Sequence, residues 1–77
     1  MKELLINIAS GLVQNPDAVT ATVDEPNDEN VIVYHLHVAD DDMGRVIGKQ
    51  GRIAKAIRVV MRAAASRNDQ KIAVEID

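Results

Sequence analysis

Two glycines that enclose two polar residues form the segment of this sequence with the clearest capacity for binding chemistry. The segment reads Gly48-Lys49-Gln50-Gly51 and has aliphatic residues on both sides. Glycine lets the backbone turn through positive φ and lets another molecule approach without meeting a Cβ. If Gly51 begins a helix, its free N–H groups point outward at the positive end of that helix, where anions bind. Because Lys49 adds a cation and Gln50 an amide, the segment is suited to holding a phosphate.

Other phosphate-binding and DNA-binding motifs fit this segment less well. A P-loop needs a longer glycine spacing followed by Lys and Ser or Thr, and a dinucleotide fingerprint needs glycine where this sequence has Val46. A helix-turn-helix DNA reader also places glycine between two helices, although it normally belongs to a helical fold. A plain corner between two helices, closed by Gly51, is the structural alternative.

The charges of the chain are unevenly distributed. The net charge is −3, but residues 1–44 carry one basic and nine acidic side chains, whereas residues 45–77 carry eight basic and three acidic ones. No acidic residue occurs from position 43 to position 68. A basic face on an acidic body directs an anionic partner to one place. The distribution therefore indicates that the bound phosphate is part of a nucleic acid. An ordinary solvated helix would instead carry a mixture of acidic and basic side chains.

The remaining pattern predicts the elements that position this segment. Helical spacing of apolar residues predicts a helix over 4–12, ended by Asn15-Pro16, because the residue before a proline avoids the helical conformation. Alternation predicts strands over 19–23, 31–38 and 72–76, with a polar turn at 26–30. Asp40-Asp41-Asp42 predicts an N-cap and a negative first turn for a short helix that ends near residue 47. A long helix follows the glycine segment to about residue 66.

The predicted fold class is α+β, with the order α-β-β-α-α-β. The first two strands form a hairpin, and the last strand lies parallel to the second through a right-handed crossover. This gives a three-stranded mixed sheet with three helices packed on one face, while His35 and His37 lie on the open face. Three faces are predicted for the long helix: a core face (Ile53, Ile57, Val60, Met61, Ala64), a basic stripe (Lys55, Arg58, Arg62) and a stripe of small residues (Ala56, Val59, Ala63).

Composition limits the remaining possibilities. The chain has 77 residues, 47% of them hydrophobic, with one aromatic residue and no cysteine. We therefore expect one domain with an aliphatic core, in a reducing cytoplasm, with no leader peptide, membrane span or cofactor. An enzyme is not expected, because the serines lie far in sequence from His35 and His37. These two histidines have no third ligand at a recognisable spacing, so no metal site is expected.

The glycine segment and its flanks resemble a known family. Residues 47–54, Ile-Gly-Lys-Gln-Gly-Arg-Ile-Ala, are similar to the I-G-x-x-G-x-x-I signature of the K-homology (KH) domain, with the last isoleucine displaced to Ile53. The element order is similar to the type II KH arrangement, and the whole chain resembles the small bacterial KH-domain proteins of the KhpA family. The resemblance implies a single KH domain over 1–77, with the N-terminal helix and first strand in 1–28 and the KH core, containing the GxxG loop 48–51, in 29–77.

The resemblance also implies a function. KH domains bind single-stranded RNA by clamping the backbone of about four nucleotides at the GxxG loop. The expected RNA-binding residues, taken by position, are Arg45, Val46, Ile47, Gly48, Lys49, Gln50, Gly51, Arg52, Ile53 and Lys55, with Ala54 as apolar support and Arg67 and Lys71 as secondary contacts. A post-transcriptional regulator or RNA chaperone is implied.

The resemblance further implies partners, and it leaves alternatives open. A homodimer through Ala56, Val59 and Ala63 and a heteromer with a larger KH-domain protein of the KhpB/Jag type are both implied, although alanines on a helix surface also simply favour the helix. The alternative functions are a protein-interaction module of the same fold with negligible RNA binding, or a DNA-binding module.

Overall fold

Six elements make up the fold. The computed structural model describes residues 1–76, except for the side chain of Lys49. In chain order the elements are α1 (Lys2–Ser10), a short 3-10 helix η1 (Pro16–Ala18), β1 (Thr20–Val23), β2 (Val31–His37), α2 (Asp40–Arg67) and β3 (Lys71–Ile76).

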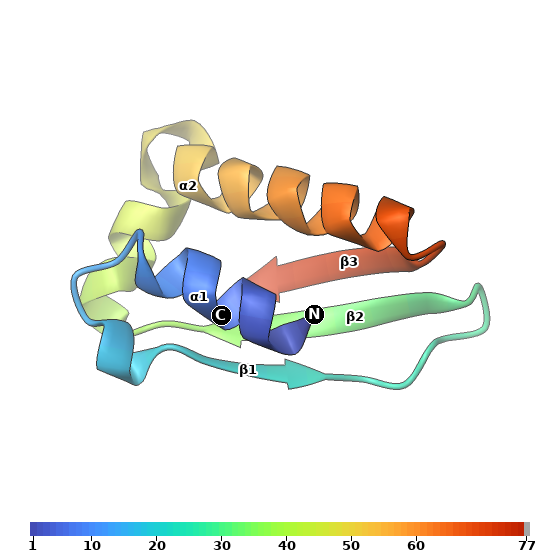
Figure 1. Ribbon diagram of the computed structural model, residues 1–77. Coiled ribbons are helices and arrows are strands. Elements are labelled where there is room, and N and C mark those ends of the chain that lie inside the picture. Colours follow the sequence, from blue (N-terminus) through green and yellow to red (C-terminus); the bar gives the residue numbers. More distant parts are fainter. Residues whose placement is uncertain (77) are drawn as a thin grey trace.

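The three strands form one mixed sheet in the order β1-β2-β3. β1 is antiparallel to β2, and β3 is parallel to β2. Helices α1 and α2 cover the same face of the sheet (Figure 1). These pairings and this layering confirm the α+β fold and the sheet topology predicted from the sequence.

A polar turn connects β1 to β2 as predicted. The side-chain oxygen of Asn27 accepts hydrogen bonds from the backbone N–H groups of Glu29 and Val31, at 2.9 and 3.0 Å. Asn30 takes the left-handed conformation, with φ of 62°, which asparagine tolerates better than most residues. The side chain of Asn27 thus supplies hydrogen bonds that a tight backbone turn would otherwise make.

The core lies between the sheet and the two helices. Tyr34 and Leu36 of β2, and Val38 just after it, alternate with residues of the open face, and each is at most 5% exposed. They pack in one cluster with side chains from both helices (Leu5 and Ala9 of α1; Val46, Ala54, Ile57 and Met61 of α2). Burying each large aliphatic side chain contributes roughly 1.5–3 kcal/mol.

The open face carries the polar side chains of the strands. His35 lies opposite Thr22 of β1 and Glu75 of β3, and its imidazole is 2.8 Å from a carboxylate oxygen of Asp24 and 3.5 Å from one of Glu75. His37 is exposed on the same face. The predicted position of both histidines is thus confirmed. From β2, His35 contacts a carboxylate just after β1 and another in β3.

The first helix is shorter than predicted. α1 ends at Ser10 with Gly11 as its C-cap, so Leu12 lies outside the helix and is 40% exposed. The helix stops before Gly11, since glycine is among the poorest helix formers. Beyond it, the carboxylate of Asp42 accepts hydrogen bonds from the backbone N–H groups of Gln14 and Asn15 in the connection to β1.

The N-cap predicted at the start of α2 is also wrong. The cap is Ala39, and no side chain caps the helix. Asp40, Asp41 and Asp42 all lie in the first turn, where their charge suits the helix dipole as predicted. The helix begins one residue earlier than it would if Asp40 were the cap. The side chain of Asp42 points inward instead and bonds the connection between α1 and β1.

The two predicted C-terminal helices form one bent element. Helical structure is continuous from Asp40 to Arg67, yet Gln50 and Gly51 have φ of 64° and 69°. We call residues 40–47 the first arm of α2, residues 48–51 the glycine bend and residues 52–67 the second arm; Figure 1 shows the arms running in different directions. The glycine segment is therefore a bend within a helix rather than a loop between two helices.

The core face of the second arm is rotated from its predicted position. Ile57 and Met61 are fully buried as predicted, but Val60 is 44% exposed, while Ala54 and Ala65 are buried at 3% and 2% exposed. The small side chains of Ala54 and Ala65 suit them to the crowded face nearest the sheet. Volume at the contact, rather than hydrophobicity alone, decides which residues face the core.

Arg58 departs from the predicted basic stripe. Its Nε donates a hydrogen bond of 3.2 Å to the backbone carbonyl of Val74, and the side chain is half-buried. Arg58 therefore attaches the second arm to β3, while Lys55 and Arg62 remain exposed.

None of the helices described in residues 1–76 contains a stretch both apolar and long enough to span a lipid bilayer.

Candidate nucleic-acid interface

The glycine bend projects from the body of the protein. Gln50 and Arg52 are exposed, and Gly48 and Gly51 are partly exposed. Gln50 and Gly51 both have positive φ, a conformation that costs a residue with a Cβ roughly 1–2 kcal/mol. A left-handed residue next to helical ones turns successive N–H groups toward a common side, where such groups bind anions. The bend is thus an exposed turn of the backbone defined by two left-handed residues, and anion binding there stays a prediction.

Gly48 has no structural reason within the protein to be glycine. Its φ lies outside the left-handed region, and a Cβ built on it would meet no atom within 4 Å. Gly51 differs, since its φ of 69° lies in the left-handed region that favours glycine. In a helix, alanine is more favourable than glycine by about 1 kcal/mol. A molecule outside the protein that approaches the backbone at Gly48 would account for the missing side chain.

Gly44 shares these properties, although the sequence did not single it out. It lies one helical turn before Gly48 on the same face, has an ordinary φ, and a Cβ there would also meet nothing within 4 Å. The sequence signal was available, because a second glycine at i−4 inside a helix is costly without a reason.

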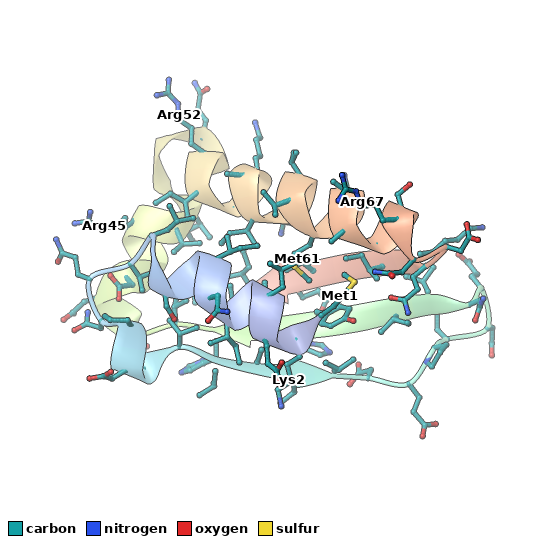
Figure 2. The ribbon with its side chains drawn as sticks, in the orientation of Figure 1. Met1, Lys2, Arg45, Arg52, Met61 and Arg67 are labelled. Atoms are coloured by element: carbon teal, nitrogen blue, oxygen red, sulfur yellow. The ribbon has the colours of Figure 1, made fainter. Side chains whose placement is uncertain are left out.

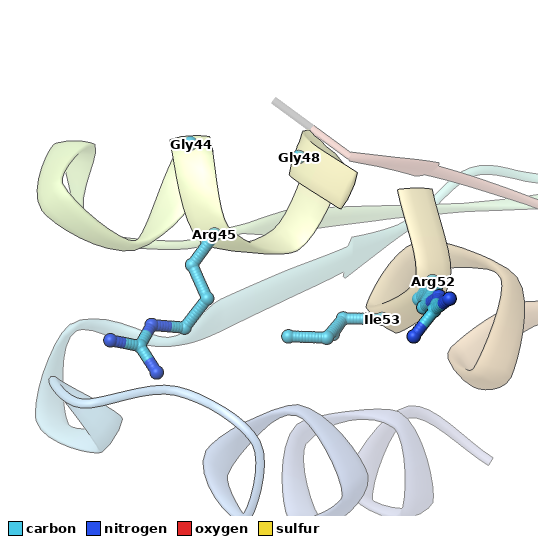
Figure 3. Close-up of a pocket in the computed structure, with 5 residues that line it drawn as sticks. All are labelled: Gly44, Arg45, Gly48, Arg52 and Ile53. Carbon is cyan, nitrogen blue, oxygen red and sulfur yellow. The ribbon is translucent and has the colours of Figure 1, made fainter. Parts of the chain in front are cut away.

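A cavity of about 420 Å³ lies beside the bend. The described residues that line it come from both arms of α2: Gly44, Arg45, Gly48, Arg52 and Ile53. Figure 3 shows Ile53 extending from the second arm toward Arg45 of the first arm, with α1 below them. The cavity therefore combines glycine backbone, one apolar side chain and two guanidinium groups.

The structure brings most of the predicted RNA-binding residues together around the bend. Arg45, Gln50, Arg52 and Lys55 are exposed, Ile47 is 56% exposed and Ile53 is half-buried. The side chain of Lys49 lies outside the described residues. Val46 and Ala54 are 0% and 3% exposed, because their side chains belong to the core. They can therefore support the RNA-binding surface from inside but cannot contact RNA.

Two predicted secondary contacts lie far from the bend. The 16 residues from Gly51 to Arg67 span about 24 Å along a helix. Figure 2 places Arg45 and Arg52 at one end of α2 and Arg67 at the other. Lys71 begins β3 just after that far end. Arg67 and Lys71 therefore lie at the opposite end of α2 from the bend, and their role as secondary contacts to a longer RNA strand stays a prediction.

Asp42 holds the first arm in place. Its carboxylate, 1% exposed, accepts hydrogen bonds of 3.0 Å from the backbone N–H of Gln14 and from both the backbone and the side chain of Asn15. The Gln14 N–H is the largest cause of a lowered pKa for Asp42, with Asn15 and the charge of Arg45 acting the same way and burial opposing them. A charged Asp42 thus joins α2 to the segment that follows α1.

The remaining titratable clusters offer no metal site. In the described part of the chain, no group of three or more His, Asp or Glu side chains is placed to hold a metal ion. The side chains around the bend are basic, which suits an anionic ligand.

Comparison with protein families identifies relatives of the whole chain. A family model for the KH domain of KhpA/KhpB matches residues 2–76. The RNA-binding protein KhpA of Listeria monocytogenes is 50% identical over 99% of this chain and 97% of that protein. The RNA-binding protein KhpA of Clostridium acetobutylicum is 54% identical over 99% of both chains.

Two solved structures of Era contain a similar fold. Era of Aquifex aeolicus bound to GDP.AlF4- matches with a TM-score of 0.68 and 20% identity, over 97% of this chain and 28% of that one. Era in complex with MgGDPNP and nucleotides of 16S ribosomal RNA matches with a TM-score of 0.61 and 18% identity, over the same shares. At this identity the similarity concerns the fold alone.

Proposed function

This chain belongs to the KhpA/KhpB family of KH domains, and we propose that it binds single-stranded RNA by holding the sugar–phosphate backbone at the glycine bend. The observation that carries the proposal is Gly48: neither its φ nor its packing requires glycine, whereas close approach of a ligand backbone does. The relatives named above are called RNA-binding proteins, which supports the same conclusion.

The bend binds the backbone, and the residues around it stabilise the flanking nucleotides. N–H groups of residues 48–51 meet one phosphate, with Lys49 and Gln50 reaching phosphate and ribose. The cations Arg45, Arg52 and Lys55 neutralise neighbouring phosphates, and the exposed Ile47 offers an apolar surface for a base. Since no aromatic side chain takes part, each base contributes less than the stacking on aromatic rings found in other RNA-binding folds.

Because one copy of the chain is expected to bind RNA weakly, two copies acting together would bind it better. We include in the proposal a homodimer through the outer face of α2, where Ala56, Val59 and Ala63 are exposed, or a heteromer with a larger KH-domain protein of the KhpB/Jag type. Two linked sites raise the apparent affinity without new contacts. In this form the protein acts in the cytoplasm as a post-transcriptional regulator or RNA chaperone and catalyses no reaction.

The double variant Lys49→Asp with Gln50→Asp tests the RNA-binding proposal. We expect the wild-type protein to bind a short single-stranded RNA with a salt slope near −2, from about three phosphate contacts at about −0.7 each. The variant should lose binding because two carboxylates repel the phosphates, while circular dichroism and melting temperature stay nearly unchanged.

A control variant separates local from general charge. Lys2→Asp with Asn7→Asp changes the net charge by the same amount on the exposed surface of α1, and it should retain most of the affinity. Equal RNA affinity of the bend variant and the wild type would contradict the proposal. Duplex DNA of the same sequence, added as competitor, should displace the RNA poorly.

A further inference from the structure

We propose that His35 is a pH-dependent link between the three strands of the sheet. Its protonated imidazole attaches β3 and the residue that follows β1 to the central strand β2, and the attachment weakens when the proton leaves. The link lies on the open face of the sheet, whereas the glycine bend belongs to α2 on the other face. The inference therefore concerns the fold and does not depend on the proposed RNA binding.

Both ring nitrogens of His35 face a carboxylate. Nε2 lies 2.8 Å from a carboxylate oxygen of Asp24, and Nδ1 lies 3.5 Å from one of Glu75. Asp24 is the first residue after β1, and its backbone N–H donates to the carbonyl of Val33 in β2 at 2.9 Å. Glu75 is directly opposite His35 in the pairing of β2 with β3. The imidazole thus lies between two carboxylates that come from opposite sides of its own strand.

The protonated imidazole satisfies both contacts, and the neutral one does not. A neutral imidazole has one N–H donor and one acceptor nitrogen, whereas the imidazolium has two donors and a positive charge. In the neutral form, one nitrogen lone pair would face a carboxylate oxygen, which also only accepts hydrogen bonds. In the charged form, Nε2 donates to Asp24 and the ring is attracted to Glu75. The two carboxylates therefore raise the pKa of His35.

The other charged groups on this face are placed to have less influence on the ring. His37 is the next side chain of β2 on the open face. Lys71 is four residues from Glu75 in β3, about 13 Å along the strand, which exceeds the screening length of about 8 Å at physiological ionic strength. Asp77 lies outside the described residues. The core separates the ring from α1 and α2, which cover the other face of the sheet (Figure 1).

The link is partly open to solvent, so its effect on stability is modest. The side chain of His35 is 32% exposed, and those of Asp24 and Glu75 are 59% and 66% exposed. Water and salt screen ion pairs of this kind. Because β1 has only four residues, a contact just beyond its end adds to a short ladder of backbone hydrogen bonds.

The direction of the pH dependence follows from the protonated form. A group whose pKa is raised by folding stabilises the folded state fully below its unfolded-state pKa, and this stabilisation is lost as pH rises through the folded value. For histidine the unfolded-state pKa is about 6.5, so the loss occurs just above that pH. Asp42 acts in the opposite direction, because its pKa is lowered and its stabilisation is lost in acid. These two groups together favour the folded state most between their titrations.

Nuclear magnetic resonance titration of the full chain measures the link directly. Asp24→Asn and Glu75→Gln each remove one negative charge and keep nearly the same shape. In both variants the titration midpoint of His35 should fall below its wild-type value, by on the order of half a pH unit for Asp24→Asn and by less for the longer contact to Glu75. The signal of His35 is the one that remains in His37→Gln.

A charge control accompanies this titration. Asp28 lies in the exposed turn between β1 and β2. Asp28→Asn removes the same charge as Asp24→Asn and should leave the midpoint of His35 nearly unchanged.

Thermal unfolding measures the consequence for the fold. From about pH 6 to about pH 8.5, across the titration of histidine, the melting temperature of the wild type should fall relative to that of His35→Gln. Glutamine keeps a hydrogen-bonding side chain but cannot be protonated. His37→Gln should retain the wild-type decrease. Other groups that titrate in this range, such as the N-terminal amine, are the same in all variants and cancel in the comparison.

Two results would overturn the inference. One is a midpoint of His35 that neither Asp24→Asn nor Glu75→Gln lowers, because the carboxylates would then not act on the ring. The other is the same pH dependence of the melting temperature in the wild type and in His35→Gln; where His35→Gln does not fold, the titration alone decides. RNA affinity enters neither measurement, so failure of the link and failure of the proposed function are distinguished.

Discussion

Two glycines that look equivalent in the sequence have different physical roles. Gly51 has a φ of 69°, in the left-handed region where a side chain costs roughly 1–2 kcal/mol. Gly48 has an ordinary φ and open space around its Cβ position, so its role depends on something outside the protein. The same substitution should therefore have opposite effects on stability at the two positions.

At Gly48, alanine should stabilise the free protein and weaken RNA binding. Gly48→Ala is expected to raise the free energy of unfolding by up to about 1 kcal/mol, because alanine is the better helix former. The added methyl group stands where the RNA backbone approaches, so the dissociation constant should rise. Urea unfolding and RNA titration measure the two effects. Unchanged RNA affinity would show that Gly48 does not face the ligand.

Asp42 should make the stability of the protein sensitive to acid. Its pKa in the folded state lies below the usual 3.8, chiefly because of the Gln14 N–H. A lowered folded-state pKa means that its stabilisation is present above the unfolded-state pKa and is lost as pH falls through the folded value. Asp42→Asn should thus lower the melting temperature by several degrees near neutral pH and have little effect in strong acid.

A neighbouring carboxylate provides the control for this titration. Asp41 lies in the same helical turn but is exposed. Asp41→Asn should leave both the melting temperature and its pH dependence almost unchanged, as measured by circular dichroism. Equal effects of the two substitutions would mean that charge in the first turn, rather than the bond to Gln14, stabilises the fold.

At the scale of elements, α2 is one helix whose two arms are fixed separately. Asp42 and Val46 hold the first arm against the α1–β1 connection and the core, and Ile57 and Met61 hold the second arm against the sheet. The bend between them is defined by two left-handed residues, Gln50 and Gly51. The angle between the arms, and hence the cavity, depends on these residues.

Alanine at Gly51 should strain this bend. A Cβ in the left-handed region costs roughly 1–2 kcal/mol, so Gly51→Ala should destabilise the protein by about that amount. For a domain of this size, 1 kcal/mol corresponds to about 4–8 °C in melting temperature. Thermal unfolding beside Gly48→Ala checks the contrast, and a melting temperature for Gly51→Ala at or above the wild-type value would contradict it.

At the scale of the whole molecule, the outer face of α2 is the candidate surface for a second copy. Val59 is 65% exposed and lies between the exposed Ala56 and Ala63. Val59→Glu should convert a dimer into a monomer in sedimentation, because a charge would be buried at the contact. RNA affinity should fall in parallel as avidity is lost.

The control for self-association is a valine elsewhere on the surface. Val23 of β1 is 42% exposed, and Val23→Glu should leave the sedimentation coefficient unchanged. The same coefficient for wild type and Val59→Glu would place the interface elsewhere or show that the protein does not self-associate.

Local patterns in the sequence were sufficient for the architecture. The alternation along β1, β2 and β3 predicted the hairpin, the parallel third strand and the open face of His35 and His37. The spacing of Gly48 and Gly51 predicted a turn of the backbone, which the structure shows at the surface. These features follow from residues close together in sequence, whose periodicity and conformational preferences act before any tertiary contact forms.

Only the tertiary structure decided which residues meet across the chain. Asp42 binds the N–H groups of Gln14 and Asn15 from 28 and 27 positions away, and Arg58 reaches the carbonyl of Val74. Ala54 and Ala65 replace Val60 on the core face, and Gly44 joins the cavity because the bend brings both arms around it. Such contacts depend on distances and volumes between elements, and a periodic pattern within one element contains no information about them.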